Sequence, residues 1–176
     1  MANTYIQIGS TVTVGAGGAA NIEFTSIPST YTDLAIKLSL RGGATSLVTM
    51  QLYMTFNNST SGYSGRQVYG DGASAASAAL SNSGAAISII NMNTSQSTAN
   101  TFSSTDIYIP NYAGSTNKSV SADSVTENNA TGGALAGLTA GLWSNTAAIT
   151  SIKFTNQDAV NFLQYSTATL YGISKS

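Results

Sequence analysis

The chain has 176 residues, of which 42% are hydrophobic and only 7% are charged, and its formal net charge is −1. Its six lysine and arginine residues are scattered, so the chain lacks the basic tract that binding to nucleic-acid phosphates requires. The absence of cysteine and histidine excludes disulfides, thiolate metal sites and catalysis by a histidine base. We therefore expect a domain with no cofactor and no metal, whose exposed faces carry mainly hydroxyl and amide groups.

The start of the chain, MANTYIQIGS, has neither the basic region nor the apolar core of a signal peptide. No apolar run approaches the roughly 18 residues of a membrane span, so no membrane partner is expected. Residues 1–176 are expected to form a single domain, in which residues 1–16 are an N-terminal strand or an arm.

Apolar residues alternate with polar ones in two long segments, TDLAIKLSLRG (32–42) and LVTMQLYMTFNN (47–58). A period of two is typical of strands with one buried face. The connector RGGATS (41–46) predicts that these two strands form an antiparallel hairpin, and the glycines of VGAGGAAN (14–21) predict a second hairpin turn.

Weaker alternation predicts further strands along the rest of the chain. They lie within residues 21–27, 85–93, 102–110, 117–127, 151–156 and 161–173. The segment DGASAASAALSNSG (71–84) has an acidic start and a glycine stop, but Leu80 is its single large apolar residue. We expect a long surface loop there, with a short helix as the alternative.

Many short strands separated by glycine, serine and asparagine predict an all-β fold. We expect an antiparallel, jelly-roll-like β-sandwich of about nine to eleven short strands with at most one short helix.

The acidic residues form no local motif, and turn or surface positions explain them better than catalysis does. They are Glu23, Asp33, Asp71, Asp106, Asp123, Glu127 and Asp158. The fragment YGDGAS lacks the alternating oxygen ligands of a calcium loop. The sequence therefore predicts a protein that is not an enzyme.

Tyrosines outside the core phase are the candidate contact residues. Tyr53 and Tyr108 fall on the polar phase of their strands, whereas Tyr63, Tyr69 and Tyr112 flank loops. Such tyrosines are typical of protein interfaces and carbohydrate platforms, and packing at a sheet edge is the alternative.

The segment GLWSNTAAITSIKF (141–154) carries the single tryptophan of the chain, which could stack on a ligand or pack in the core. We expect two strands around a polar turn. Leu142 and Trp143 should then point to opposite faces, with Trp143 inside or at a sheet edge.

Four segments together resemble small β-rich virion proteins of tailed phages, especially phages of marine bacteria. These segments are GGAANIEFTSIPSTYTDLAIKLSLR, LYMTFNNSTSGYSGRQVYGDGASA, GLWSNTAAITSIKF and TATLYGI, and they extend from about Gly17 to Ile173. The chain departs from the pattern in its low charge and in its alanine-serine segment at residues 73–79.

The resemblance implies a head decoration (cement) protein, a jelly-roll trimer that binds the major capsid protein and copies of itself on the capsid surface. Such a protein would be made in the host cytoplasm. The alternative is a tail-fibre module that binds a glycan receptor, with Tyr63, Tyr69, Tyr112 and the segment 71–84 as its contacts.

Overall fold

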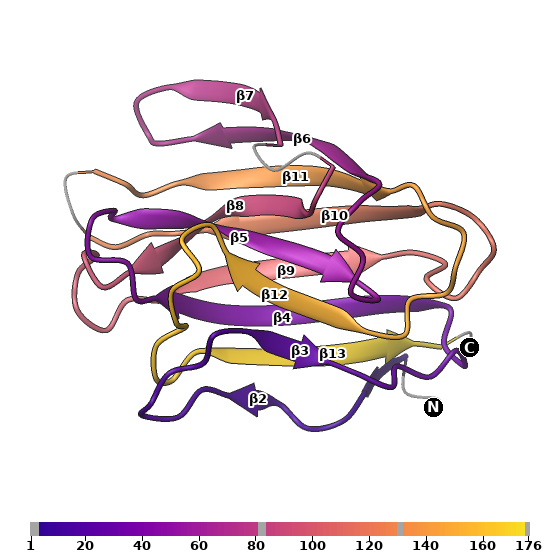
Figure 1. Cartoon of the computed structure of the whole chain (residues 1–176). Helices are drawn as coiled ribbons and strands as arrows, with labels where there is room; N and C mark the ends of the chain where they lie inside the picture. The colour runs from indigo at the N-terminus through magenta and orange to yellow at the C-terminus, as the bar shows by residue number, and fades with distance from the viewer. Residues whose placement is uncertain (1–3, 81–83, 130–131, 175–176) are drawn as a thin grey trace.

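The computed structural model describes residues 4–80, 84–129 and 132–174 (Figure 1). Within these ranges the chain is all-β, as predicted, and it contains no helix that could span a membrane. Thirteen strands are present: β1 (Tyr5–Gln7), β2 (Val12–Thr13), β3 (Ile22–Phe24), β4 (Asp33–Gly42), β5 (Thr49–Phe56), β6 (Tyr63–Gly70), β7 (Ala75–Ala79), β8 (Ile87–Thr94), β9 (Ser103–Ile109), β10 (Lys118–Val125), β11 (Ala136–Trp143), β12 (Ile152–Asn156) and β13 (Thr167–Ile173).

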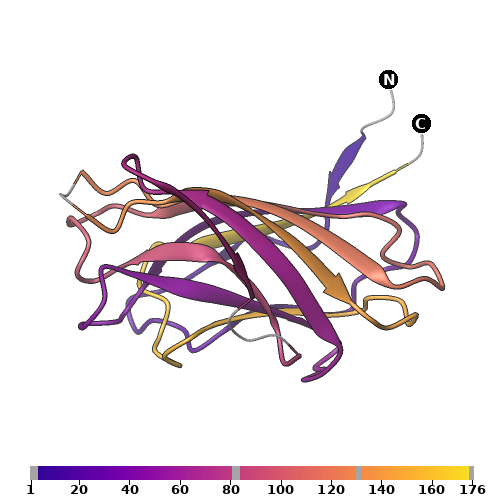
Figure 2. The same cartoon turned by 90° about the horizontal axis from the view of Figure 1, so that it is seen from above.

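The strands form two layers, which Figure 2 shows from above. In sheet A, β1 and β2 both pair with β13, and the order continues β13-β4-β9-β10-β11-β6-β7. Sheet B has the order β3-β12-β5-β8. The sheets join where the end of β4 pairs in parallel with the end of β8; every other strand pairing is antiparallel. The strands β2-β13-β4-β9 of sheet A and β3-β12-β5-β8 of sheet B have the order of a jelly roll, and β10, β11, β6 and β7 extend sheet A beyond β9.

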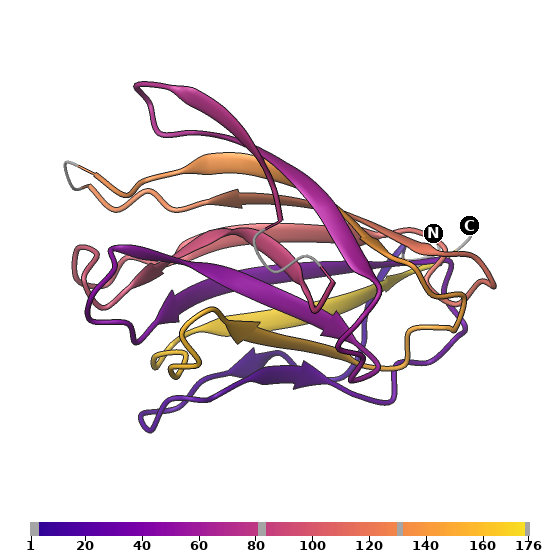
Figure 3. The ribbon, with the colours of Figure 1, turned by 45° about the horizontal axis from the view of Figure 1, so that its top comes forward.

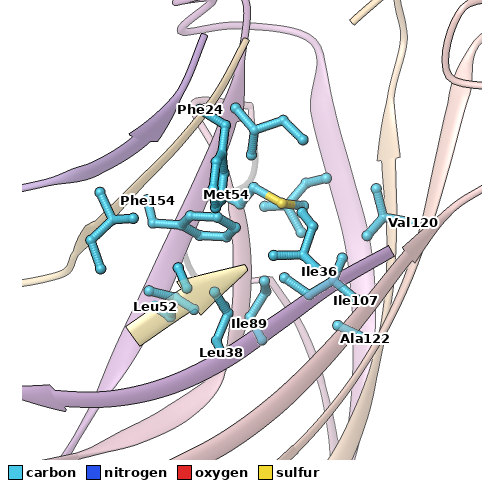
Figure 4. Packing of buried hydrophobic residues seen from close by; sticks show 14 of the residues in the cluster. Phe24, Ile36, Leu38, Leu52, Met54, Ile89, Ile107, Val120, Ala122 and Phe154 are labelled. Carbon is cyan, nitrogen blue, oxygen red and sulfur yellow. The ribbon is translucent and has the colours of Figure 1, made fainter. Parts of the chain in front are cut away.

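The core lies between the sheets. The strictly alternating burial of β5 and β10 confirms the predicted period of two, because one side of each strand faces the other sheet. Figure 4 shows how side chains of both sheets meet. Sheet A contributes Ile36, Leu38, Ile107, Val120 and Ala122, and sheet B contributes Phe24, Leu52, Met54, Ile89 and Phe154.

Both predicted hairpins are wrong. Strands β4 and β5 lie in different sheets, so residues 43–48 cross from sheet A to sheet B. The glycine segment likewise leads from β2 in sheet A to β3 in sheet B. Alternation predicts which side chains of a strand are buried. It does not predict whether the next strand in the chain pairs with it in the same sheet or packs against it from the other sheet.

The prediction for residues 71–84 is also wrong, because β7 occupies Ala75–Ala79 and pairs antiparallel with β6. The Asp71 carboxylate accepts the backbone N–H groups of Ala73 (2.9 Å) and Ser74 (2.7 Å), which turns the chain back along β6. The hairpin β6–β7 forms the far end of sheet A, beyond β11 (Figure 3). Residues 81–83 lie outside the described ranges.

The N-terminal segment forms strands where it is described. Strand β1 pairs with the end of β13 and β2 pairs with its beginning, so both lie along one edge of β13. The expected N-terminal strand is therefore two short ones, while residues 1–3 lie outside the described ranges.

The side chain of Arg41 is buried at the junction of the two sheets. Its guanidinium donates to the carbonyls of Ser97 (2.9 Å), Thr98 (2.8 Å) and Thr101 (2.8 Å), in the loop between β8 and β9. Burial lowers the pKa of Arg41 from its ordinary value, since the charged form loses water. This arginine therefore ties a loop to the sheet junction.

Lys118, at the start of β10, is also buried and bonds to backbone oxygens. Its Nζ donates to the carbonyls of Gly114 (2.7 Å) and Thr116. Burial lowers the pKa of this ammonium group. Lys118 therefore holds the turn before β10 and adds no charge to the surface.

Candidate interaction surface

The solvent side of sheet A, termed the outer face, is the candidate surface. Along β10, Ser119, Ser121, Asp123 and Val125 are exposed, while the residues between them are buried. Strand pairing aligns such exposed residues into rows that cross the sheet.

One row of the outer face changes in character from charged to apolar. Cross-strand register aligns its members from β4 through β9, β10, β11 and β6 to β7. In that order they are Lys37, Asp106, Asp123, Leu138, Val68 and Ser77. The charged end lies over the middle of sheet A, and the apolar end leads to its edge.

The apolar end of this row is unusually exposed. Val68 is 53% exposed, Leu138 55% and Val125 47%, and Val68 and Leu138 are direct cross-strand neighbours. With Gly70, Ala75, Ala136 and others they line a shallow groove of about 830 Å³, in which Asp123 is the charged member. Contiguous exposed apolar side chains of this kind mark sites of contact with another molecule.

The floor of this groove is held from below by Gly137 of β11. A Cβ at this position would lie 2.3 Å from Ile90 Cδ1 and 2.5 Å from the Val68 carbonyl oxygen. Strand β8 thus packs directly against the backbone of β11, which fixes the sheet under the groove.

The charged end of the row holds an ion pair between Lys37 and Asp106. Both side chains are about half exposed, so the pair adds little stability. The hydrogen bond that Lys37 donates to the Asp106 carboxylate raises the pKa of Lys37. Asp123 lies directly across from Asp106, and like charges in such a position disfavour the pairing.

A smaller hollow of about 270 Å³ lies beside this ion pair, and its lining includes Tyr5 and Tyr108. The Tyr108 hydroxyl donates to Asp33 Oδ2 (2.9 Å), and the Asn111 N–H donates to Asp33 Oδ1 (2.8 Å). The bond to a carboxylate raises the pKa of the Tyr108 hydroxyl. These bonds hold the ring of Tyr108 on the outer face.

Two of the five candidate tyrosines lie in the core, which removes them from any contact surface. Tyr63 Oη accepts the Phe56 N–H (2.8 Å), and Tyr112 Oη donates to the Pro28 carbonyl. Burial raises the pKa of both hydroxyls. Tyr63 joins the start of β6 to the end of β5, and Tyr112 joins the loop after β9 to the loop before β4. The loop-flanking position in the sequence was therefore a poor guide to exposure.

The other three tyrosines do not gather in one site. Tyr108 is on the outer face of sheet A, and Tyr53 is half-buried on β5 of sheet B. Tyr69, also half-buried, lies on β6 next to Gly137. Of the five, Tyr108 alone lines the hollow beside the Lys37–Asp106 pair.

Trp143 packs in the core, as predicted, and Leu142 points to the opposite side of β11. The indole stacks on Tyr63, with ring centroids 6.1 Å apart and an interplanar angle of 16°, and lies 5.6 Å from the Phe56 ring. The two strands predicted around the polar turn are β11 of sheet A and β12 of sheet B. The segment 141–154 therefore connects the two sheets.

Val68, Val125 and Leu138 were not among the contact residues predicted from the sequence, whereas the candidate Tyr69 does line the groove. One signal was present: Val125 is out of phase with Val120 and Ala122, whose side chains are buried on the same strand. An apolar residue on the polar phase of a strand indicates a contact surface on the outer side.

The residues that the structure describes contain no group of three or more Asp or Glu side chains that could hold a metal ion. Asp106 and Asp123, which the sheet register places face to face, are an acidic pair only.

No protein-family model matches this chain, and neither a curated protein nor a solved structure matches it. The resemblance to phage virion proteins therefore stays a prediction from sequence motifs.

Proposed function

We propose that this protein is a structural protein of a tailed-phage virion. It binds the head shell as a symmetric oligomer, a trimer, and contacts the major capsid protein through the groove of the outer face. The observation that carries the proposal is the exposed apolar cluster of Val68, Val125 and Leu138, which lines a groove with Asp123 as its charged member. The cores of protein interfaces are depleted in charge in the same way.

The stabilising role follows from the coupling between binding of this protein and assembly of the shell. A protein that binds the assembled shell, but not its separate subunits, stabilises the shell by mass action. Such a protein needs a rigid surface more than it needs reactive groups. The close packing of β8 on β11 beneath the groove supplies that rigidity.

The test uses phage heads that lack the protein. Adding the purified chain is expected to raise the temperature at which these heads release DNA. Leu138→Lys places a charge in the groove and is expected to weaken binding to heads about tenfold or more. Ser119→Lys, an equally accessible change on β10 outside the groove, is the control and should bind like the wild type. Heads that gain no stability, or equal binding by both variants, would contradict the proposal.

A second candidate function rests on the smaller hollow. Its aromatic rings (Tyr5 and Tyr108) and its carboxylates (Asp106 and Asp123) are groups that suit a sugar. The protein would then be a receptor-binding module of a tail fibre. Glycan-array binding that Tyr108→Ala abolishes, together with no binding to heads, would favour this function over the first.

A further inference from the structure

Strand β7 is an open edge of sheet A. In the described part of the chain it pairs with β6 alone, and all five of its residues, Ala75–Ala79, are exposed. A strand in this position presents a row of backbone N–H and C=O groups that another strand can bind.

The hydrogen bonds at both ends of the β6–β7 ladder show which groups are presented. Asp71 N donates to Ser74 O (3.2 Å), and Leu80 N donates to Gly65 O (3.3 Å). Because bonded and non-bonded pairs alternate in an antiparallel ladder, Ala76 and Ala78 direct their backbone groups toward β6. The N–H and C=O groups of Ala75, Ser77 and Ala79 therefore face the open side.

β7 has none of the features that usually block an edge strand. Its sequence, AASAA, contains no charged residue and no proline, and its register with β6 is regular. Strand β3, the edge of sheet B, differs because it carries Glu23, whose carboxylate lies 3.8 Å from Lys153 Nζ. Alanine is also a weak strand former, so β7 gains little from its own side chains.

The sequence of β7 reads the same in both directions around Ser77. We propose that β7 pairs antiparallel with β7 of a second copy of this chain, about a twofold axis at Ser77. Each Ser77 would then face its counterpart, and Ala75 would face the counterpart of Ala79. Three bonded pairs would form, with about six backbone hydrogen bonds in all. The small side chains bring no clash and no like charges to this contact.

The twofold contact extends sheet A from one copy into the next. Ser77 lies next to Val68 in the outer-face row, so the grooves of the two copies would meet across the axis. The contact is isologous and thus differs from the heterologous contacts that close a threefold ring. The inference goes beyond the proposed function, because edge pairing is a property of the isolated chain.

The test exploits the absence of cysteine from the chain. Ser77→Cys introduces a single thiol at the axis, where a cross-strand Cα separation of about 5.5 Å is within the range of a disulfide. Mild oxidation is expected to convert most of the variant to a linked pair on a non-reducing gel. Ser119→Cys, equally exposed on β10, is the control and should stay largely unlinked.

The second measurement is the molecular mass in solution, determined by sedimentation equilibrium. Chain concentrations should extend to about 1 mM, because so short an interface binds weakly. The wild type should reach an even multiple of the 17.9 kDa chain, and Ser77→Lys should halve that mass by placing like charges at the axis. Ser119→Lys should keep the wild-type mass.

A wild-type mass that is an odd multiple of one chain, or equal linking of both cysteine variants, would overturn the inference. So would an unchanged mass of Ser77→Lys. A chain that pairs through β7 and does not bind phage heads would contradict the proposed function alone. Head binding by an unpaired chain would contradict the β7 contact alone.

Discussion

Tyr63 shows how a side chain next to a loop becomes part of the core. Its ring packs against both Phe56 and Trp143, and its hydroxyl bonds to the Phe56 backbone and to the Ser59 carbonyl. The hydroxyl thus ties the end of β5 to the start of β6. A buried hydroxyl without these bonds would destabilise the fold.

Tyr63→Phe is expected to lower the free energy of unfolding by about 1–2 kcal/mol near pH 8, because it removes these hydrogen bonds. Burial raises the folded-state pKa of Tyr63 above the ordinary value of 10.0, so the unfolded chain loses this proton first as the pH rises. The contribution of the hydroxyl to the free energy of unfolding is therefore fully present below about pH 10 and declines above that pH.

Urea unfolding of both proteins, followed by circular dichroism at pH 8 and pH 11, checks this prediction. The difference in the free energy of unfolding between the wild type and Tyr63→Phe should be smaller at pH 11 than at pH 8. A constant difference would mean that Tyr63 does not titrate differently in the folded and unfolded chains.

At the residue scale, the sequence predicted the burial of Trp143 but not that of Tyr63 and Tyr112. Alternation alone would bury Leu138 and Leu142 of β11, whereas the structure buries the opposite phase, which contains Trp143. The hydroxyl of Tyr112 is satisfied by the distant carbonyl of Pro28, and no local pattern contains that pairing. The hydroxyl of Tyr63 bonds to Phe56 and Ser59 across the turn before β6, which the apolar period does not reveal.

At the element scale, strands with one buried face were predicted well, because every second side chain must be apolar to pack in the core. Strands β5, β9 and β10 are examples. Strand β7 was missed because five exposed alanine and serine residues have no apolar period. The partner of each strand was harder to predict than its buried face. Strand β4 pairs with β9 and β13, which follow it at a distance in the chain, and not with β5.

Arg41→Lys is expected to loosen the loop between β8 and β9. A lysine can donate from one point, whereas the planar guanidinium spans the carbonyls of Ser97, Thr98 and Thr101. We expect unfolding free energy to fall by about 1–3 kcal/mol, with amide hydrogens of residues 96–101 exchanging about tenfold faster.

Hydrogen exchange read by mass spectrometry provides the measurement. Arg66→Lys is the matched control, since Arg66 is exposed and donates to the carbonyl of the adjacent Gly65. Equal exchange in the two variants would show that Arg41 does not hold the loop.

At the scale of the whole molecule, the surface is even less charged than the composition indicates. Arg41 and Lys118 are buried against backbone carbonyls, while Lys37 and Lys153 pair with Asp106 and Glu23. The net charge of the whole chain, −1, is too small to keep copies apart. A surface of this kind suits a protein that is covered by copies of itself or by a shell.

The most direct measurement of the proposed role is cryo-electron microscopy of intact phage particles that carry this protein. We expect many copies on the head at threefold or quasi-threefold positions, with the groove formed by Val68, Val125 and Leu138 covered by the shell. A few copies confined to the tail, or a head on which this groove faces solvent, would contradict it.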